Sequence, residues 1–317
     1  MRRWPTWLLV GALAALGALA AADALRGNEA GVRVQENPRP AAPDVTRELR
    51  LREPRGILYY SDPQDGCRLR GVALPRLENA PPPDLGSCAF SLSPDSTAVL
   101  PGTVSWSPRG GLYARESNRM IELGSQGSEP SLRFPGRAPA FMPDGAFTYA
   151  LGGEVVAWTT DCPEDARLFT LPGDNASVRC RRTIARFRSP VTGLAWLSTS
   201  RMAVVVRPSE YELLIREGDR TLLRVPGWGA PITHVSVSPR GTYVGMRAEG
   251  RGGVLVFHRG GWAVPLPPLN EIRSLAWSPD DEWTAAATDF SVFVFRTDEP
   301  SASVRRLPIV ARDLAWR

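Results

Sequence analysis

The stretch "SLAWSPDDEWTAAAT", residues 274–288, contains two short apolar runs joined by Ser278-Pro279-Asp280-Asp281. Proline presets φ, and an aspartate side chain can bond to backbone N–H groups just after it, so this tetrapeptide predicts a tight turn. Apolar runs of this length on both sides of a turn are typical of antiparallel strands. The stretch therefore predicts a strand, a turn and a second strand.

The same unit recurs along the chain. Its relatives are "TVSWSPRGGLYARES" (103–117), "APAFMPDGAFTYALG" (138–152), "TGLAWLSTSRMAVVV" (192–206) and "THVSVSPRGTYVGMR" (233–247). A large apolar residue before the turn marks each copy: Trp106, Phe141, Trp196, Val237, Trp277 and Trp316. The markers lie about 40 residues apart, with one interval of about 55, and this period predicts four-stranded propeller blades.

The two ends of the repeat region are complementary. The chain ends on "RDLAWR" (312–317), which is a first strand without its partners, whereas residues 55–74 read as second and third strands. With "SCAFSLSP" (87–94) as the fourth strand, joining the ends completes a sixth blade and pairs edges that would otherwise be exposed. Residues 90–96, "FSLSPDS", also match the first strand and turn of the repeat, so a second division of the chain into blades stays open. The predicted fold is all-β: a six-bladed β-propeller of four-stranded blades over residues 55–317.

The turn motifs at 277–280, 106–110 and 141–145 resemble the TolB-like (WD40-like) six-bladed β-propeller repeat of exported bacterial proteins. Residues 196–199 depart from that pattern, because they lack Pro-Asp-Gly. The resemblance covers about residues 55–317 and implies an extracytoplasmic binding or scaffolding module. A fold does not fix an activity, so the resemblance implies no particular ligand.

The first 26 residues have the pattern of an export signal or a membrane anchor. Arg2 and Arg3 precede an apolar run from residue 7 to 22, which predicts either a signal peptide cleaved after Ala22 or a transmembrane anchor that ends near Leu25. Residues 27–54 are polar and rich in proline and alanine, as expected of a flexible tether. Both alternatives place the propeller outside the cytoplasm, at the cell membrane, in the periplasm or secreted.

The chain has four cysteines, Cys67, Cys88, Cys162 and Cys180. An even number in an exported chain predicts disulfides between cysteines adjacent in sequence, Cys67–Cys88 and Cys162–Cys180, each contributing about 2–4 kcal/mol on the chain-entropy account. On the division above, each bridge is expected to join the third and fourth strands of one blade. There is no C-x-x-C pair near a histidine, so no metal site is predicted. No cofactor is predicted either.

The distribution of charged residues limits which classes of partner are expected. All 38 basic residues are arginine, they are interspersed with 33 acidic residues, and the net charge is +5. An all-arginine composition is typical of a GC-rich genome. The chain has no basic block with interleaved aromatic residues, so nucleic-acid binding is not predicted. Schiff-base chemistry is excluded because the chain has no lysine.

Catalytic signatures are sparse. The two histidines, His234 and His258, fall on different strands of the expected blades, and no G-x-S-x-G elbow is present. Paired-carboxylate chemistry stays open, since distances are not readable from the sequence. Asp95, Asp144 and Asp280 sit in turns, where a capping role is expected. The chain is therefore not expected to be an enzyme.

The favoured function is a non-catalytic scaffold that mediates protein–protein interaction at the bacterial cell envelope. Its candidate contact surface is the loop at 170–183, which carries Arg179, Arg181 and Arg182 next to a predicted bridge. The alternative for this loop is a solvated segment without a partner.

The alternative function is a receptor for a small ligand or glycan in the propeller funnel, with a hydrolase less favoured. Trp228 and Trp262 lie in the glycine-rich stretches "VPGWGAP" and "RGGWAVP" and are the candidate exposed tryptophans. The tryptophans at the repeat markers are expected to pack in the core.

Overall fold

The computed structural model describes residues 53–159, 162, 169–170, 178–207, 211–226, 230–248, 252–257, 262–265, 272–300 and 303–317. The chain divides into two compact units, Met1–Glu48 and Leu49–Arg317, and the second contains every described residue. The predicted signal or anchor at 1–26 and nearly all of the tether at 27–54 lie outside the described residues. In the described part of the chain, no helix is long and apolar enough to cross a membrane.

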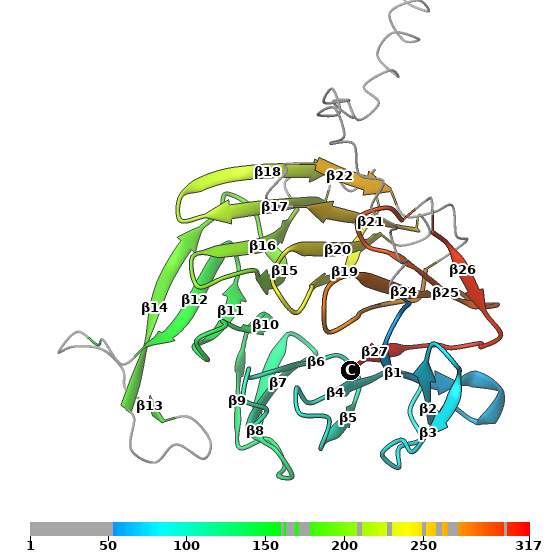
Figure 1. Ribbon diagram of the computed structural model, residues 1–317. Coiled ribbons are helices and arrows are strands. Elements are labelled where there is room, and N and C mark those ends of the chain that lie inside the picture. Colours follow the sequence, from blue (N-terminus) through cyan, green and yellow to red (C-terminus); the bar gives the residue numbers. More distant parts are fainter. Residues whose placement is uncertain are drawn as a thin grey trace, which may run out of the picture. The chain divides into compact units, whose positions relative to one another are not determined.

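The Leu49–Arg317 unit is a β-propeller (Figure 1). Its strands form five four-stranded sheets, one five-stranded sheet and one two-stranded sheet, and all strand pairs are antiparallel. In the described chain the only helical element is one 3-10 turn, η1 (Pro63–Asp65). The all-β propeller fold is therefore confirmed.

Each sheet runs from an inner to an outer strand. The first contains β27 (Leu314–Trp316), β1 (Gly56–Asp62), β2 (Arg68–Leu74) and β3 (Glu78–Ala80). The two-stranded sheet contains β4 (Phe90–Leu92) and β5 (Val99–Pro101), and the next sheet contains β6 (Val104–Trp106), β7 (Leu112–Ser117), β8 (Met120–Ser125) and β9 (Leu132–Pro135).

The five-stranded sheet contains, in spatial order, β10 (Arg137–Phe141), β11 (Phe147–Leu151), β12 (Glu154–Thr159), β14 (Val178–Arg186) and β13 (Phe169–Thr170). The next has β15 (Val191–Trp196), β16 (Arg201–Val206), β17 (Glu212–Glu217) and β18 (Arg220–Pro226). The last two have β19 (Ile232–Val237), β20 (Tyr243–Ala248), β21 (Gly252–Phe257) and β22 (Trp262–Pro265), and then β23 (Ser274–Trp277), β24 (Trp283–Ala287), β25 (Val292–Arg296) and β26 (Arg305–Leu307).

The predicted count of six four-stranded blades is wrong, because among the described residues only five sheets have four strands. The segment 87–94 is not the outer strand of the first sheet; β3 takes that place, and β4 pairs with β5 in a sheet of its own. Ser93 closes the turn after β4, accepting from Ser96 N at 2.9 Å, so "FSLSPDS" is a shortened copy of the repeat. A two-stranded copy breaks the regular spacing on which the count depended.

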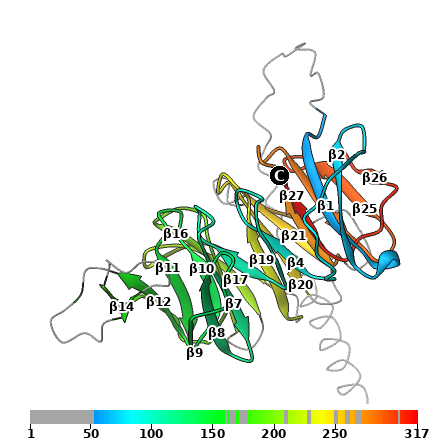
Figure 2. The same cartoon turned by 90° about the horizontal axis from the view of Figure 1, so that it is seen from below.

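The predicted closure of the two chain ends is confirmed. β27 pairs with β1 in the register Leu58↔Trp316 and Tyr60↔Leu314. Successive inner strands also pack on each other, from β23 to β27, β4, β6, β10, β15 and β19. Trp277 Nε1 donates to Ser236 Oγ at 3.0 Å and joins β23 to β19, so the inner strands form a closed ring (Figures 1 and 2).

The marker tryptophans pack in the core as predicted, with Trp106 half-buried. Trp196, Trp277 and Trp316 are 9%, 7% and 2% exposed. Between the last and first sheets, Trp316 packs with Trp283, Leu58 and the small residues of β24. Tryptophans buried at three sheet boundaries help to fix the spacing of the inner strands, which in turn defines the channel between them.

The turn aspartates cap their turns as expected. Asp144 accepts from Ala146 N at 2.9 Å, and Asp95 and Asp280 accept from Thr97 N and Glu282 N at 3.2 and 3.1 Å. The structure adds Asp281, which is buried and reaches the preceding sheet, where it accepts from Ser238 Oγ at 2.7 Å.

Both predicted disulfides are present, Cys67–Cys88 and Cys162–Cys180. The second links the end of β12 to the neighbouring strand β14, as expected. The first does not join two strands of one sheet: Cys67 immediately precedes β2, whereas Cys88 lies before β4. It therefore ties the first sheet to the two-stranded sheet.

Candidate functional site

The ring of inner strands encloses two adjoining cavities. One has a volume of about 350 Å³ and is lined by β4, β19, β23 and β27; the other, of about 480 Å³, is lined by β6, β10, β15 and β19. Thr103 and His234 border both. The two cavities are therefore neighbouring parts of one central channel.

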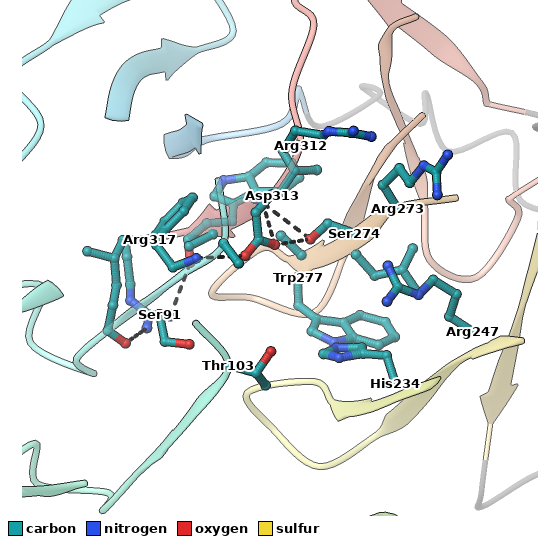
Figure 3. A pocket seen from close by; sticks show the side chains of 18 of the residues that line it. Ser91, Thr103, His234, Arg247, Arg273, Ser274, Trp277, Arg312, Asp313 and Arg317 are labelled. Carbon is teal, nitrogen blue, oxygen red and sulfur yellow. Dashed lines mark hydrogen bonds between the residues drawn. The ribbon is translucent and has the colours of Figure 1, made fainter. Parts of the chain in front are cut away.

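Three arginines meet at one edge of the first cavity. Arg247 lies near the end of β20, a second strand, while Arg273 and Arg312 lie just before the first strands β23 and β27. Second strands end, and first strands begin, at the same edge of an antiparallel sheet. Figure 3 shows Arg273, Arg247 and His234 following one another along one side of the cavity.

Asp289 holds two of the three arginines. Arg273 donates to it through Nε and Nη2 at 2.9 and 2.8 Å, and Arg312 donates through Nη1 at 3.0 Å. The hydrogen bonds from Arg273 hold the pKa of the Asp289 carboxyl below its usual range. One carboxylate thus orients two guanidinium groups and leaves an excess of positive charge.

Arg247 is held differently. Its Nε donates to Thr233 Oγ1 at 3.2 Å, and it forms no ion pair with any carboxylate in the described residues. Burial lowers the pKa of the guanidinium, while the nearby Asp313 carboxylate raises it and the like charge of Arg273 lowers it. The net lowering means that a positive charge at this position is only partly compensated within the protein.

His234 lies next to this charge. Burial, with the charge of Arg247, lowers the pKa of the imidazole from 6.5 to about 4, so the ring is neutral at pH 7. Within the described residues the imidazole makes no hydrogen bond to a serine or a carboxylate, so no triad is assembled through it. His258 lies outside the described residues.

Asp313 lines the same cavity and has a structural role. Its carboxylate accepts from Ser274 Oγ at 2.6 Å, Phe90 N at 3.0 Å and Leu314 N at 2.9 Å (Figure 3). Burial raises the pKa of Asp313. The carboxylate links β23 and β27 to β4, which belongs to the two-stranded sheet.

An exposed aromatic residue lies beside the arginines. Phe290 follows Asp289 in the turn between β24 and β25 and is 74% exposed. We define the Phe290 patch as Phe290, Asp289, Arg273 and Arg312. It combines an exposed ring with two oriented guanidinium groups.

The three arginines of the predicted loop lie on strand β14, at the other edge of the sheets, and residues 171–177 of that loop lie outside the described residues. Arg179 and Arg182 border a cavity of about 610 Å³ together with Asp144, which belongs to the turn between β10 and β11. Arg181 lies over the rings of Phe134 and Tyr149, with its guanidinium carbon 5.4 and 5.9 Å from the ring centroids. These three arginines are therefore not part of the channel.

The two candidate tryptophans receive no structural account. Trp228 lies outside the described residues, and Trp262 lies on β22 without a described side chain. Among the described residues, no group of three metal-ligating side chains is present. The sequence reasoning also missed the channel arginines, although an arginine directly before "SLAW" and "DLAW" was a usable signal.

Two comparisons with known proteins found no match, and a third found a similar solved structure. No family model matches the chain, and no curated protein matches it. The structure is similar to the β-propeller domain of Cps50 (Swd1) from Myceliophteria thermophila, with 12% identity, a TM-score of 0.48 and coverage of 79% of this chain and 84% of that one. The propeller fold rests on the sheets described above, and membership of the TolB-like family stays a prediction.

Proposed function

We propose that this protein is a non-catalytic binding propeller that acts outside the cytoplasmic membrane and holds a protein partner at the bacterial envelope. Its loops are mounted on a rigid ring of sheets, an arrangement commonly used for protein interaction. Two disulfides support the location, because such bonds persist in oxidising compartments and are rare in the cytosol.

The Phe290 patch is the observation that carries the proposal. Exposed aromatic and arginine side chains are enriched among residues that dominate binding energy at interfaces. Asp289 already orients Arg273 and Arg312, so little side-chain entropy is lost when they bind. The chemistry fits a partner with an apolar pocket for the phenyl ring and acidic residues around it.

The test is site-specific photocrosslinking in intact cells. A photoreactive residue replaces Phe290 in one strain and Val304 in another, since Val304 is 38% exposed and lies between β25 and β26, at the opposite edge. We expect one dominant protein adduct from position 290 and none from position 304. The same adducts from both positions would contradict the proposal.

A binding measurement with the crosslinked partner gives the magnitude. Phe290→Ala should weaken binding by about tenfold or more, as expected for an interface anchor, while the free energy of unfolding changes by less than about 0.5 kcal/mol. Leu151→Ala is the matched control, because Leu151 is an exposed apolar residue in another turn between second and third strands.

A further inference from the structure

The charges around the first cavity do not balance. Four arginines line it, Arg247, Arg273, Arg312 and Arg317, and the one carboxylate in the lining is that of Asp313. Asp289 pairs with Arg273 and Arg312, and Arg317 donates to backbone oxygens of Leu92, Ser93 and Trp316. Asp313 offsets part of the charge of Arg247, but it already accepts three hydrogen bonds and makes no ion pair with Arg247 in the described structure. Of the four, Arg247 is the arginine whose two terminal nitrogens have no bonded partner in the described part of the chain.

The free end of Arg247 has a defined geometry. Thr233 occupies its Nε, and among the described residues no hydrogen bond is made by Nη1 or Nη2. These two nitrogens form a planar fork, which matches the two oxygens of a carboxylate. The charge is half-buried, so an ion pair here is screened less than on the open surface.

The surroundings suit an organic acid. His234 is neutral and can present one N–H group towards the cavity, while Trp277 and Val237 supply apolar wall. A cavity of about 350 Å³ lies at the small end of the range for ligand pockets. A doubly charged phosphate would need a second arginine with unbonded terminal nitrogens, whereas Arg273 and Arg312 pair with Asp289 and Arg317 donates to backbone oxygens.

We propose that the central channel binds a small monocarboxylate, anchored by the two terminal nitrogens of Arg247 with His234 beside it. This site adjoins the Phe290 patch, whose Arg273 and Arg312 also line the cavity, and goes beyond the protein contact proposed above. It assigns to the channel a small-ligand role that needs neither Arg273 nor Arg312.

The experiment is an NMR titration of the full chain labelled with ¹³C-histidine. The chain has only two histidines, so His234→Gln identifies the His234 signal by its loss. Butyrate, benzoate and inorganic phosphate are the probes. We expect saturable shifts of the His234 signal with butyrate or benzoate and a rise in the pKa of His234, because a carboxylate beside an imidazole favours its protonation.

Two variants locate the anchor. Arg247→Gln should abolish saturable binding, and Arg247→Lys should weaken it by about tenfold or more, because lysine keeps the charge and loses the fork. Arg224→Gln, which removes an exposed arginine on β18, should leave binding unchanged. The proposal is overturned by unchanged binding in folded Arg247→Gln, by binding of phosphate alone, or by the absence of any saturable shift.

Discussion

The indole Nε1 of Trp316 donates a hydrogen bond to the backbone oxygen of Arg55 at 2.9 Å, across 261 residues of sequence. The next residue continues the contact, since Ile57 N donates to Arg317 O at 2.6 Å. The first described strand and the last strand therefore form one sheet, and the ring closes between them.

Trp316→Ala should lower the free energy of unfolding by about 3–5 kcal/mol, because it removes a fully buried aromatic side chain and leaves a cavity between two sheets. Urea denaturation measures the change. Val304→Ala, at an exposed position, is the control and should change stability by less than about 0.5 kcal/mol. Equal effects would mean that closure contributes little.

Asp281→Ala should destabilise more than Asp144→Ala. Asp281 is 5% exposed and accepts from both Ser238 Oγ and Arg240 N in the neighbouring sheet, so its loss leaves buried donors unpaired, at a cost of about 2–3 kcal/mol. Asp144 caps only its own exposed turn, so about 1 kcal/mol or less is expected. Thermal unfolding of both variants tests the order, and a reversed order would refute the inter-sheet role.

Reduction of the disulfides should lower stability by about 2–4 kcal/mol for each bridge, given sequence separations of 21 and 18 residues. Intact mass after alkylation should detect four thiols only after reduction. Alkylation of protein isolated from cells without a reductant tests the proposed location. Free thiols in that sample would count against an oxidising compartment.

Stability should fall on acidification because of His234. Its pKa is about 4 in the folded state and about 6.5 when unfolded, so the folded state resists protonation. The stability present above pH 6.5 is lost as the pH falls towards 4, by up to about 2–3 kcal/mol. His234→Gln should weaken this pH dependence in urea titrations at pH 7 and pH 4.5. An identical pH profile for the variant would contradict the assignment.

Arg182→Glu is the cleaner test of the predicted arginine contact. Arg181 lies over two buried aromatic rings, so its reversal should cost about 0.5–2 kcal/mol of stability by itself. If this edge binds a protein, Arg182→Glu should reduce capture of that partner at a temperature at which the variant is fully folded. Unchanged capture would confine binding to the other edge.

The repeat at 274–288 and its copies predicted the strands, the turns and the ring closure, because strand periodicity and turn chemistry are local properties of the chain. The predicted blade count was wrong because of one short segment of the chain. The copy at 90–96 lacks outer strands of its own, and the sequence alone does not say whether such a segment joins an existing sheet or forms a small one.

The sequence by itself determined that this chain closes into a propeller with buried marker tryptophans and neighbouring disulfides. Tertiary structure alone decided the candidate site. Arg247, Arg273 and Arg312 are ordinary charged residues in sequence, and they line one edge of the channel only because three sheets meet there. Whether a charged side chain has an ion-pair partner depends on distances between segments that are remote in sequence. Tertiary packing sets those distances, and the local sequence pattern does not.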